Sequence, residues 1–274
     1  MRRGILEALL FGILEGVTEW LPISSTGHLI LLQRLLETEW DARFFSLFEV
    51  VIQLGAIAAV PTLFFTPLWP FSRKKTAAER KNTWLLWGKI LLATLPAALA
   101  GALLEDILDT YLYNAFTVAV ALVFYGVLFL LLEKKRRAPR VLTVASLGVK
   151  DALFIGCFQI LSLVPGTSRS GSTILGGMAL GVERSAAAFF SFYLAIPVMV
   201  GAGLLKTAKF FLAGGALCRE EWILLGTGVL TAYLVSLSAI RFLLDFVRRH
   251  SFAAFGVYRI LLGAAVLLTL FKKG

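Results

Sequence analysis

The chain has 274 residues, of which 58% are hydrophobic and only 16% are charged. An ordinary soluble domain is roughly 45–50% apolar and about 25% charged, so this composition excludes a soluble globular enzyme and a disordered chain. The two cysteines, Cys157 and Cys218, provide neither a disulfide framework nor a zinc motif. The composition therefore predicts an integral membrane protein.

The formal net charge is +10, and a basic surface is the usual sign of nucleic-acid binding. Here, however, lysine and arginine concentrate in three segments between apolar runs, at residues 67–83, 133–150 and 241–253. Cytoplasmic loops of membrane proteins carry such an excess of positive charge. We therefore expect contact with membrane lipid and no nucleic-acid partner.

The hydrocarbon core of a bilayer is about 30 Å thick and needs about 20 apolar residues for each helical crossing. Six apolar runs approach that length, at residues 44–66, 84–104, 115–132, 186–206, 222–240 and 254–271. Two further regions, residues 4–36 and 151–181, each hold two shorter apolar stretches around a segment rich in proline, glycine and serine. The sequence predicts an all-α polytopic protein with about six transmembrane helices and two re-entrant broken hairpins.

The two halves of the chain resemble each other at a constant offset. The break around Pro22 matches that around Pro165, and the segment 44–46 (FFS) matches 189–191 (FFS). Three predicted crossings follow each break, so residues 1–274 form one membrane domain with internal repeats at about 1–135 and 150–274. An odd number of crossings in each repeat predicts opposite orientations, which is an inverted-topology repeat.

Charge indicates how this repeat lies in the membrane. The three basic segments fall on one side, which we expect to be cytoplasmic. Residues 105–114, with Glu105, Asp106 and Asp109 and no basic residue, fall on the other side together with residues 207–221. The first hairpin then enters from outside and the second from the cytoplasm, and their polar tips should meet inside the membrane.

The first break carries two acidic residues. Glu15 and Glu19 are four residues apart in a helical context, so their carboxylates lie on one face. They can hold a divalent cation or divide acid and base roles, and the alternative is a pair of interfacial glutamates neutralised by lysine. We favour function, because ionisable groups within an apolar span are costly.

Hydroxyl groups follow Pro22 and precede a short apolar helix: Ser24, Ser25 and Thr26, then Gly27 and His28. These hydroxyls can simply cap the helix. The same helix N-terminus also offers N–H groups and a positive dipole end to an anion. His28 either passes a proton or bonds a backbone carbonyl.

The second break places Arg169 among small and hydroxyl-bearing neighbours, namely Thr167, Ser168, Ser170 and Gly171. A guanidinium offers a planar fork of donors that suits phosphate oxygens, although an ion pair with Glu15 or Glu19 is the alternative. Two carboxylates, a hydroxyl cluster, an arginine and two helix N-termini together predict a phosphate site. Its apolar setting indicates that the rest of the ligand is lipid.

Three segments resemble a known family: EGVTEWLPISSTGH at 15–28, EVVIQLG at 49–55 and PGTSRSG at 165–171. Their order and spacing are similar to those of the undecaprenyl-diphosphate phosphatase, or bacitracin-resistance protein, family. The resemblance implies an enzyme of the bacterial inner membrane that hydrolyses a C55 isoprenoid diphosphate to its monophosphate and so recycles the carrier lipid for the cell wall. It also implies bacitracin resistance, an active site open to the outer face, and dependence on Mg²⁺ or Ca²⁺.

Carried over by position, the resemblance makes Glu15 and Glu19 the paired glutamates, Ser25 the candidate nucleophile and Arg169 the phosphate-binding arginine. The proton of Ser25 would pass to His28 or to a glutamate. A directly attacking water is an open alternative, as is a carrier that flips a lipid phosphate with the same site. Whether the protein forms a homodimer is also open.

Overall fold

The computed structural model describes residues 1–112, 114–135 and 138–271. The side chains at positions 105, 106, 109 and 269–271 also fall outside the described part. The predicted acidic cluster at Glu105, Asp106 and Asp109 therefore lies outside the described residues. The regular structure of the described chain is helical, and its one β-type contact is an isolated parallel bridge between Val141 and Val182.

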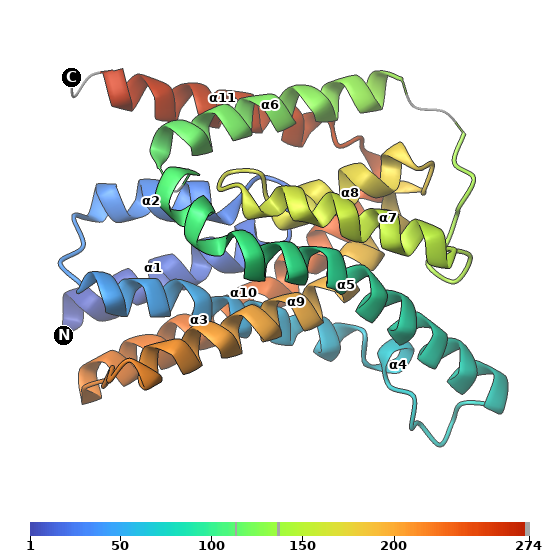
Figure 1. The fold of residues 1–274 in the computed structure, drawn as a ribbon, viewed down its shortest axis with the longest axis horizontal. Helices are drawn as coiled ribbons and strands as arrows, with labels where there is room; N and C mark the ends of the chain where they lie inside the picture. The colour runs from blue at the N-terminus through green and yellow to red at the C-terminus, as the bar shows by residue number, and fades with distance from the viewer. Residues whose placement is uncertain (113, 136–137, 272–274) are drawn as a thin grey trace.

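The helices follow one another along the chain, and the longest connection lies between α6 and α7 (Figure 1). Their bounds are α1 Arg2–Thr18, α2 Ser25–Leu36, α3 Ala42–Leu63, α4 Phe65–Leu68, α5 Ala77–Leu112, α6 Ala115–Lys134, α7 Val149–Ile160, a 3₁₀ turn Leu161–Leu163, α8 Arg169–Ala179, α9 Arg184–Leu212, α10 Arg219–Arg249 and α11 Ala253–Phe271.

Five described helices are long and apolar enough to cross a membrane, namely α3, α5, α6, α9 and α10. The sixth predicted crossing corresponds to α11, whose described stretch Ala253–Leu268 is a shorter apolar helix. The architecture is that of an all-α polytopic membrane protein, as predicted.

The helix bounds differ from the predicted runs at the polar ends. Helix α5 continues to Leu112 through most of the expected loop 105–114, and α10 continues to Arg249 into the expected loop 241–253. Hydropathy marks only the apolar part of a helix, whereas glutamate, lysine and arginine also favour helix and extend it into water. Caps then mark some of the ends, as at Asn114, whose side chain accepts a 2.9 Å hydrogen bond from the Thr117 N–H.

The two predicted breaks are present, and the short helices beside them are too short to cross. Helices α2 and α7 have 12 residues each and α8 has 11, which gives each a length of roughly 18 Å or less at 1.5 Å per residue. In Figure 1 the hairpin α1–α2 occupies the left half of the view and α7–α8 the right half. The breaks in both hairpins therefore lie toward the middle of the molecule.

Helix pairs that are distant in sequence hold this arrangement. Helix α1 packs on α10, α7 packs on α5, and α6 packs along α11. A Cβ atom on Gly126 would lie 2.7 Å from the Gly256 carbonyl oxygen, and one on Gly256 would lie 2.8 Å from the Gly126 carbonyl oxygen. Small residues allow this close backbone approach of α6 and α11, as is common between membrane helices.

The long axis of the molecule separates the two predicted sets of loops. The N-terminus, the end of α11 and the α9–α10 connection lie at the left end of Figure 1, whereas α4, the start of α5 and the segment 138–148 lie at the right end. The basic segment 67–83 and the described part of the basic segment 133–150 therefore lie at the end opposite the N-terminus.

Candidate active site

The first break is formed by a helix end and a strained serine. Helix α1 ends at Thr18 with Glu19 as its C-cap, and α2 begins at Ser25. Ser24 adopts a φ of 75°, and its hydroxyl accepts a 3.4 Å hydrogen bond from the Gly27 N–H. This geometry places Glu19 and Ser25 side by side in the interior, with only 8% and 9% of their surfaces exposed.

The second break has the same local form. Ser168 has a φ of 72° and caps α8 by accepting a 3.1 Å hydrogen bond from the Gly171 N–H. Gly166 has a φ of 91°, and a Cβ atom there would lie 2.6 Å from the Val118 carbonyl oxygen, so only glycine fits. The expectation that a hydroxyl caps the helix after the first break is confirmed for Ser24, and Ser168 caps α8 in the same way.

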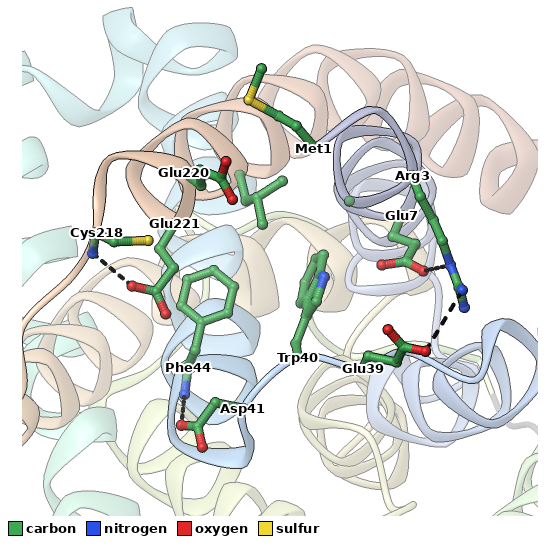
Figure 2. Close-up of a pocket in the computed structure, with 12 residues that line it drawn as sticks. Met1, Arg3, Glu7, Glu39, Trp40, Asp41, Phe44, Cys218, Glu220 and Glu221 are labelled. Carbon is green, nitrogen blue, oxygen red and sulfur yellow. Dashed lines mark hydrogen bonds and ion pairs between the residues drawn. The ribbon is translucent and has the colours of Figure 1, made fainter.

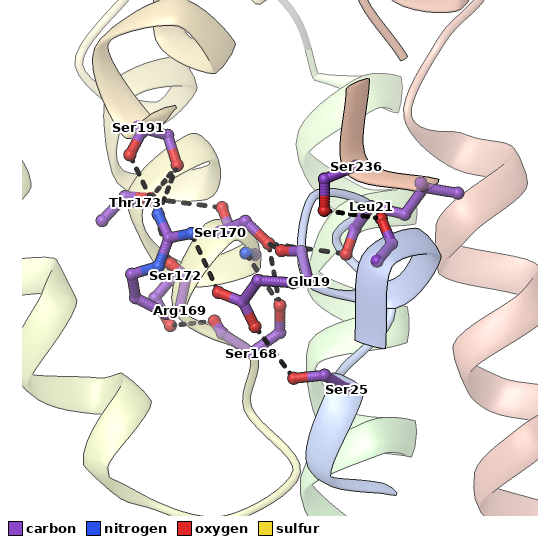
Figure 3. Close-up of polar contacts among 12 residues, drawn as sticks. Glu19, Leu21, Ser25, Ser168, Arg169, Ser170, Ser172, Thr173, Ser191 and Ser236 are labelled. Atoms are coloured by element: carbon purple, nitrogen blue, oxygen red, sulfur yellow. Dashed lines mark hydrogen bonds and ion pairs between the residues drawn. The ribbon is translucent and has the colours of Figure 1, made fainter. Parts of the chain in front are cut away.

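One carboxylate joins the two breaks (Figure 3). The Ser25 hydroxyl donates a 2.9 Å hydrogen bond to Oε2 of Glu19, and Arg169 donates a 3.0 Å hydrogen bond from Nη2 to Oε1. The side chains of Arg169 and Glu19 are 10% and 9% exposed. Of the two predicted glutamates, Glu19 is thus the ion-pair partner of Arg169.

Further contacts orient the guanidinium. Arg169 donates from Nη1 to the carbonyl oxygen of Ser191 on α9 at 2.9 Å. The Ser191 hydroxyl in turn lies 2.7 Å from that of Thr173, and the guanidinium lies 6.0 Å from the centre of the Trp20 ring. Because the fork is held on several sides, Arg169 presents a fixed geometry to a ligand.

The polar tips of the two hairpins meet, as predicted. The Ser170 hydroxyl donates to the backbone oxygen of Glu19 at 3.0 Å and lies 3.4 Å from that of Leu21. The N-termini of α2 and α8 both start within this region, so both positive dipole ends contribute to it. The arrangement suits a group that carries concentrated negative charge.

Glu15 lies one helical turn before Glu19 and is fully buried. Neither of its carboxylate oxygens has a hydrogen-bond partner, and the charged groups that act on it are Glu19, Glu49 and Arg169. A buried carboxylate without a partner is costly. Its oxygens are the ligand type that Mg²⁺ and Ca²⁺ prefer, so the donor set fits a divalent cation.

Among the described residues, no group of three or more histidine, cysteine or acidic side chains could hold a metal ion by itself. Mg²⁺ is commonly bound by one or two carboxylates together with water and substrate phosphate oxygens. The unpartnered oxygens of Glu15 suit that mode of binding, whereas both oxygens of Glu19 already accept hydrogen bonds, one from Ser25 and one from Arg169.

His28 belongs to a different set of contacts. Its Nδ1 lies 2.7 Å from the Ser24 carbonyl oxygen, and its Nε2 lies 2.7 Å from the hydroxyl of Tyr258 on α11. A carbonyl only accepts, so Nδ1 carries the hydrogen and Nε2 accepts from the tyrosine. The structure therefore joins Ser25 to Glu19 and not to His28.

Two further predicted residues, Thr26 and Thr167, belong to the two breaks. Thr26 is half-buried in the first turn of α2, and Thr167 is fully buried directly before Ser168.

Sequence reasoning missed Ser191, Tyr258 and Arg259, which complete the cluster from α9 and α11. Arg259 could have been found, because it is an arginine within the apolar run 254–271 and such residues are rarely placed there without a role. Ser191 and Tyr258 gave no such signal, because serine and tyrosine are common in membrane helices.

A separate pocket of about 400 Å³ lies at the end of the molecule that carries the N-terminus (Figure 2). It is lined by acidic residues such as Glu39 and Glu220, together with Trp40 and Arg3. None of the predicted phosphate-binding or catalytic residues lines it, so the chemistry expected from the two breaks lies elsewhere.

The sequence also matches known proteins over nearly its whole length. The profile of the family described as Bacitracin resistance protein BacA matches residues 8–265. The undecaprenyl-diphosphatase of Enterococcus faecalis is 48% identical to this chain, over 95% of each of the two chains. That of Lactiplantibacillus plantarum is 49% identical, over 96% of each. That of Acetivibrio thermocellus is 50% identical over 96% of this chain and 97% of its own. The chain belongs to the Bacitracin resistance protein BacA family.

Proposed function

We propose that the protein hydrolyses undecaprenyl diphosphate to undecaprenyl phosphate and inorganic phosphate, and that this recycling of the carrier lipid confers bacitracin resistance. One observation carries the proposal: the Glu19 carboxylate contacts both the Ser25 hydroxyl and the Arg169 guanidinium. A base, a nucleophile and a phosphate-binding group thus share one buried site. The relatives at 48–50% identity, named undecaprenyl-diphosphatase, support the same reaction.

Substrate binding follows from the donors at the two helix N-termini. We assign binding of the terminal phosphate to Arg169 and to the residues around the two helix N-termini, namely Ser24, Thr26, Gly27, Thr167, Ser168, Ser170 and Gly171. Phosphoryl transfer is mostly a matter of positioning and charge stabilisation. Donors fixed by helix geometry provide both before the reaction begins.

In the first step, Glu19 accepts the proton of Ser25 while the serine oxygen forms a bond to the terminal phosphorus. The bond from that phosphorus to the bridging oxygen breaks, and undecaprenyl phosphate leaves with the electron pair. Glu19 passes this proton to the departing undecaprenyl phosphate and is again a carboxylate. A water then attacks the phosphoserine, its proton passes to Glu19, and Glu19 returns it to the serine oxygen as inorganic phosphate leaves. In the open alternative, Glu19 deprotonates a water that attacks the phosphorus directly.

Glu15 and Glu19 are the residues that would hold a Mg²⁺ or Ca²⁺ ion. When bound, such a cation would neutralise negative charge on the diphosphate. The unpartnered oxygens of Glu15 support this assignment.

The protein is a multi-pass membrane protein, and we place it in the bacterial inner membrane with the site open to the outer face. The distribution of basic residues supports this orientation, because they concentrate at the end of the molecule opposite the N-terminus. The matching cap geometry of Ser24 and Ser168 supports a duplication with repeats at about 1–135 and 150–274. One chain supplies every residue of the site, so the proposed reaction needs no homodimer.

Purified protein in detergent, incubated with undecaprenyl diphosphate with and without a chelator, tests the proposal. We expect inorganic phosphate to be released in an amount equal to the undecaprenyl phosphate formed, and the chelator to stop the release. Movement of a lipid phosphate across vesicle membranes without phosphate release would instead identify a carrier, because a carrier needs the arginine and the helix dipoles but no base or nucleophile.

A further inference from the structure

Arg259 on α11 is fully buried beneath the two breaks. It donates from Nη1 to the Pro22 carbonyl oxygen at 3.1 Å, and from Nη2 to the carbonyl oxygens of Gly166 and Thr167 at 2.8 and 2.9 Å. One planar group therefore contacts the backbone of both breaks, from a helix that belongs to neither hairpin.

These carbonyls stand just before the strained positions of the site. Pro22 precedes Ser24 by two residues, and Thr167 directly precedes Ser168. Both serines have a positive φ, which a residue other than glycine keeps only where the surrounding structure holds it. The guanidinium fixes the chain next to each of these serines.

The position of Arg259 is set by these carbonyls and not by an ion pair. Among the described residues, its acceptors are neutral carbonyl oxygens, and the guanidinium lies over the Tyr125 ring, 5.7 Å from its centre. A buried guanidinium without a carboxylate partner is unfavourable. A planar fork with several donors can nevertheless bridge two segments, which a single ammonium group does poorly.

We propose that Arg259 is a positioning residue that holds the two breaks in register, so that Ser25 of the first break faces Arg169 of the second. The inference rests on the proposed phosphatase function. The hydroxyl of Ser170 is a second tie between the same two segments, because it donates to the Glu19 carbonyl oxygen. The neighbouring Tyr258 contacts His28 and so joins α11 to the first turn of α2 as well.

Two substitutions separate geometry from charge. Arg259→Met removes the positive charge and the planar fork of donors, whereas Arg259→Lys keeps a cation of similar length but not the fork. The lysine variant also covers the case in which the methionine variant does not fold. Arg184→Met is the matched control, because Arg184 is a partly buried arginine that is paired with Glu133 and contacts neither break. For each variant, kcat and KM for undecaprenyl diphosphate and the Tm are measured.

We expect Arg259→Lys to lower kcat at least tenfold. Its Tm should be no lower than that of Arg184→Met. The kcat of Arg184→Met should stay within twofold of the wild-type value. Adding Ser170→Ala to Arg259→Lys should lower kcat by more than the product of the two single effects, because both ties hold the same register. A lysine variant with more than half of the wild-type kcat, or purely multiplicative effects in the double variant, would overturn the inference.

A binding measurement keeps this test separate from the proposed reaction. Pyrophosphate is a soluble probe of the diphosphate group, and its effect on Tm does not depend on turnover. We expect it to raise the Tm of the wild type and of Arg184→Met, and to raise that of Arg259→Lys much less. If pyrophosphate raises the Tm of Arg259→Lys as much as that of the wild type, the proposed role of Arg259 is contradicted. If the wild type shows the Tm shift but releases no phosphate from undecaprenyl diphosphate, only the proposed hydrolysis is contradicted.

Discussion

The hydroxyl of Ser25 donates a 2.9 Å hydrogen bond to the carboxylate of Glu19, which lies six residues earlier on the other side of the first break. Both side chains are buried, and the second oxygen of the carboxylate accepts from Arg169. A hydroxyl that already donates to a buried carboxylate is arranged to lose its proton to it. This contact distinguishes a hydrolytic site from one that only binds phosphate.

Ser25→Ala removes the proposed nucleophile and leaves the base in place. We expect kcat to fall by about 10³-fold or more, in line with the loss of an attacking hydroxyl in other enzymes. Acid quenching of the wild type with substrate labelled in the terminal phosphate, followed by peptide mapping, should place the label on Ser25. An alanine variant that keeps more than about a tenth of the wild-type kcat would instead indicate direct attack by a water that Glu19 activates.

Glu15→Gln should make the protein more stable and less active. Both oxygens of Glu15 are buried without a hydrogen-bond partner, and removing an unpaired buried charge should raise the free energy of unfolding by about 1 kcal/mol or more. In chelator, the Tm of the variant should therefore exceed that of the wild type. Phosphate release should fall strongly even at saturating Mg²⁺, and wild-type turnover under that condition would make Glu15 a purely structural residue.

Arg169→Lys should not restore the site, although it keeps the positive charge. The guanidinium contacts Glu19 and Ser191 at the same time, and lysine offers a point charge in place of that fork. We expect kcat to fall as well as KM to rise, because paired charge-assisted bonds should tighten as charge develops on the phosphoryl group. A lysine variant with near-native kcat and only a weaker KM would favour the carrier.

The orientation in the membrane can be tested with a native cysteine. Cys218 is exposed in the α9–α10 connection, at the end that we place outside. In a Cys157→Ala background, an impermeant maleimide added to intact spheroplasts should label Cys218. In a chain without native cysteines, Leu142→Cys, at a 63% exposed position of the opposite end, should be labelled only after lysis. Labelling of the introduced cysteine in intact spheroplasts would contradict the orientation.

Much of the fold could be predicted because it depends on properties that a sequence displays directly. The apolar runs identified the spans, and the segments around Pro22 and Pro165 identified the two breaks. The ends of α5 and α10 were misplaced because hydropathy does not mark where a helix leaves the membrane and continues in water. Residues 105–114 were expected to form a loop, yet α5 extends to Leu112.

Within the site, residue types predicted the groups but not their partners. For Arg169 the sequence left two partners open, a phosphate or a glutamate. Its contact with Glu19 joins residues 150 positions apart, and residue types alone do not predict such a pairing. The same limit applies to His28, whose partner Tyr258 lies 230 residues away. Arg259 lies outside both motifs and contacts their backbone from another helix, so neither motif marks it.

Phosphate release by Glu19→Gln tests most directly whether Glu19 is the base that activates Ser25. The change removes the charge and keeps the volume, and Glu7→Gln is a matched control, because Glu7 is a buried glutamate on the same helix that pairs with Arg3 at the far end. With undecaprenyl diphosphate and saturating Mg²⁺, we predict that Glu19→Gln releases inorganic phosphate about 10²- to 10⁴-fold more slowly than the wild type, while Glu7→Gln stays within a factor of about three. A Glu19→Gln variant that is folded and releases phosphate at the rate of Glu7→Gln would contradict the proposed role of Glu19.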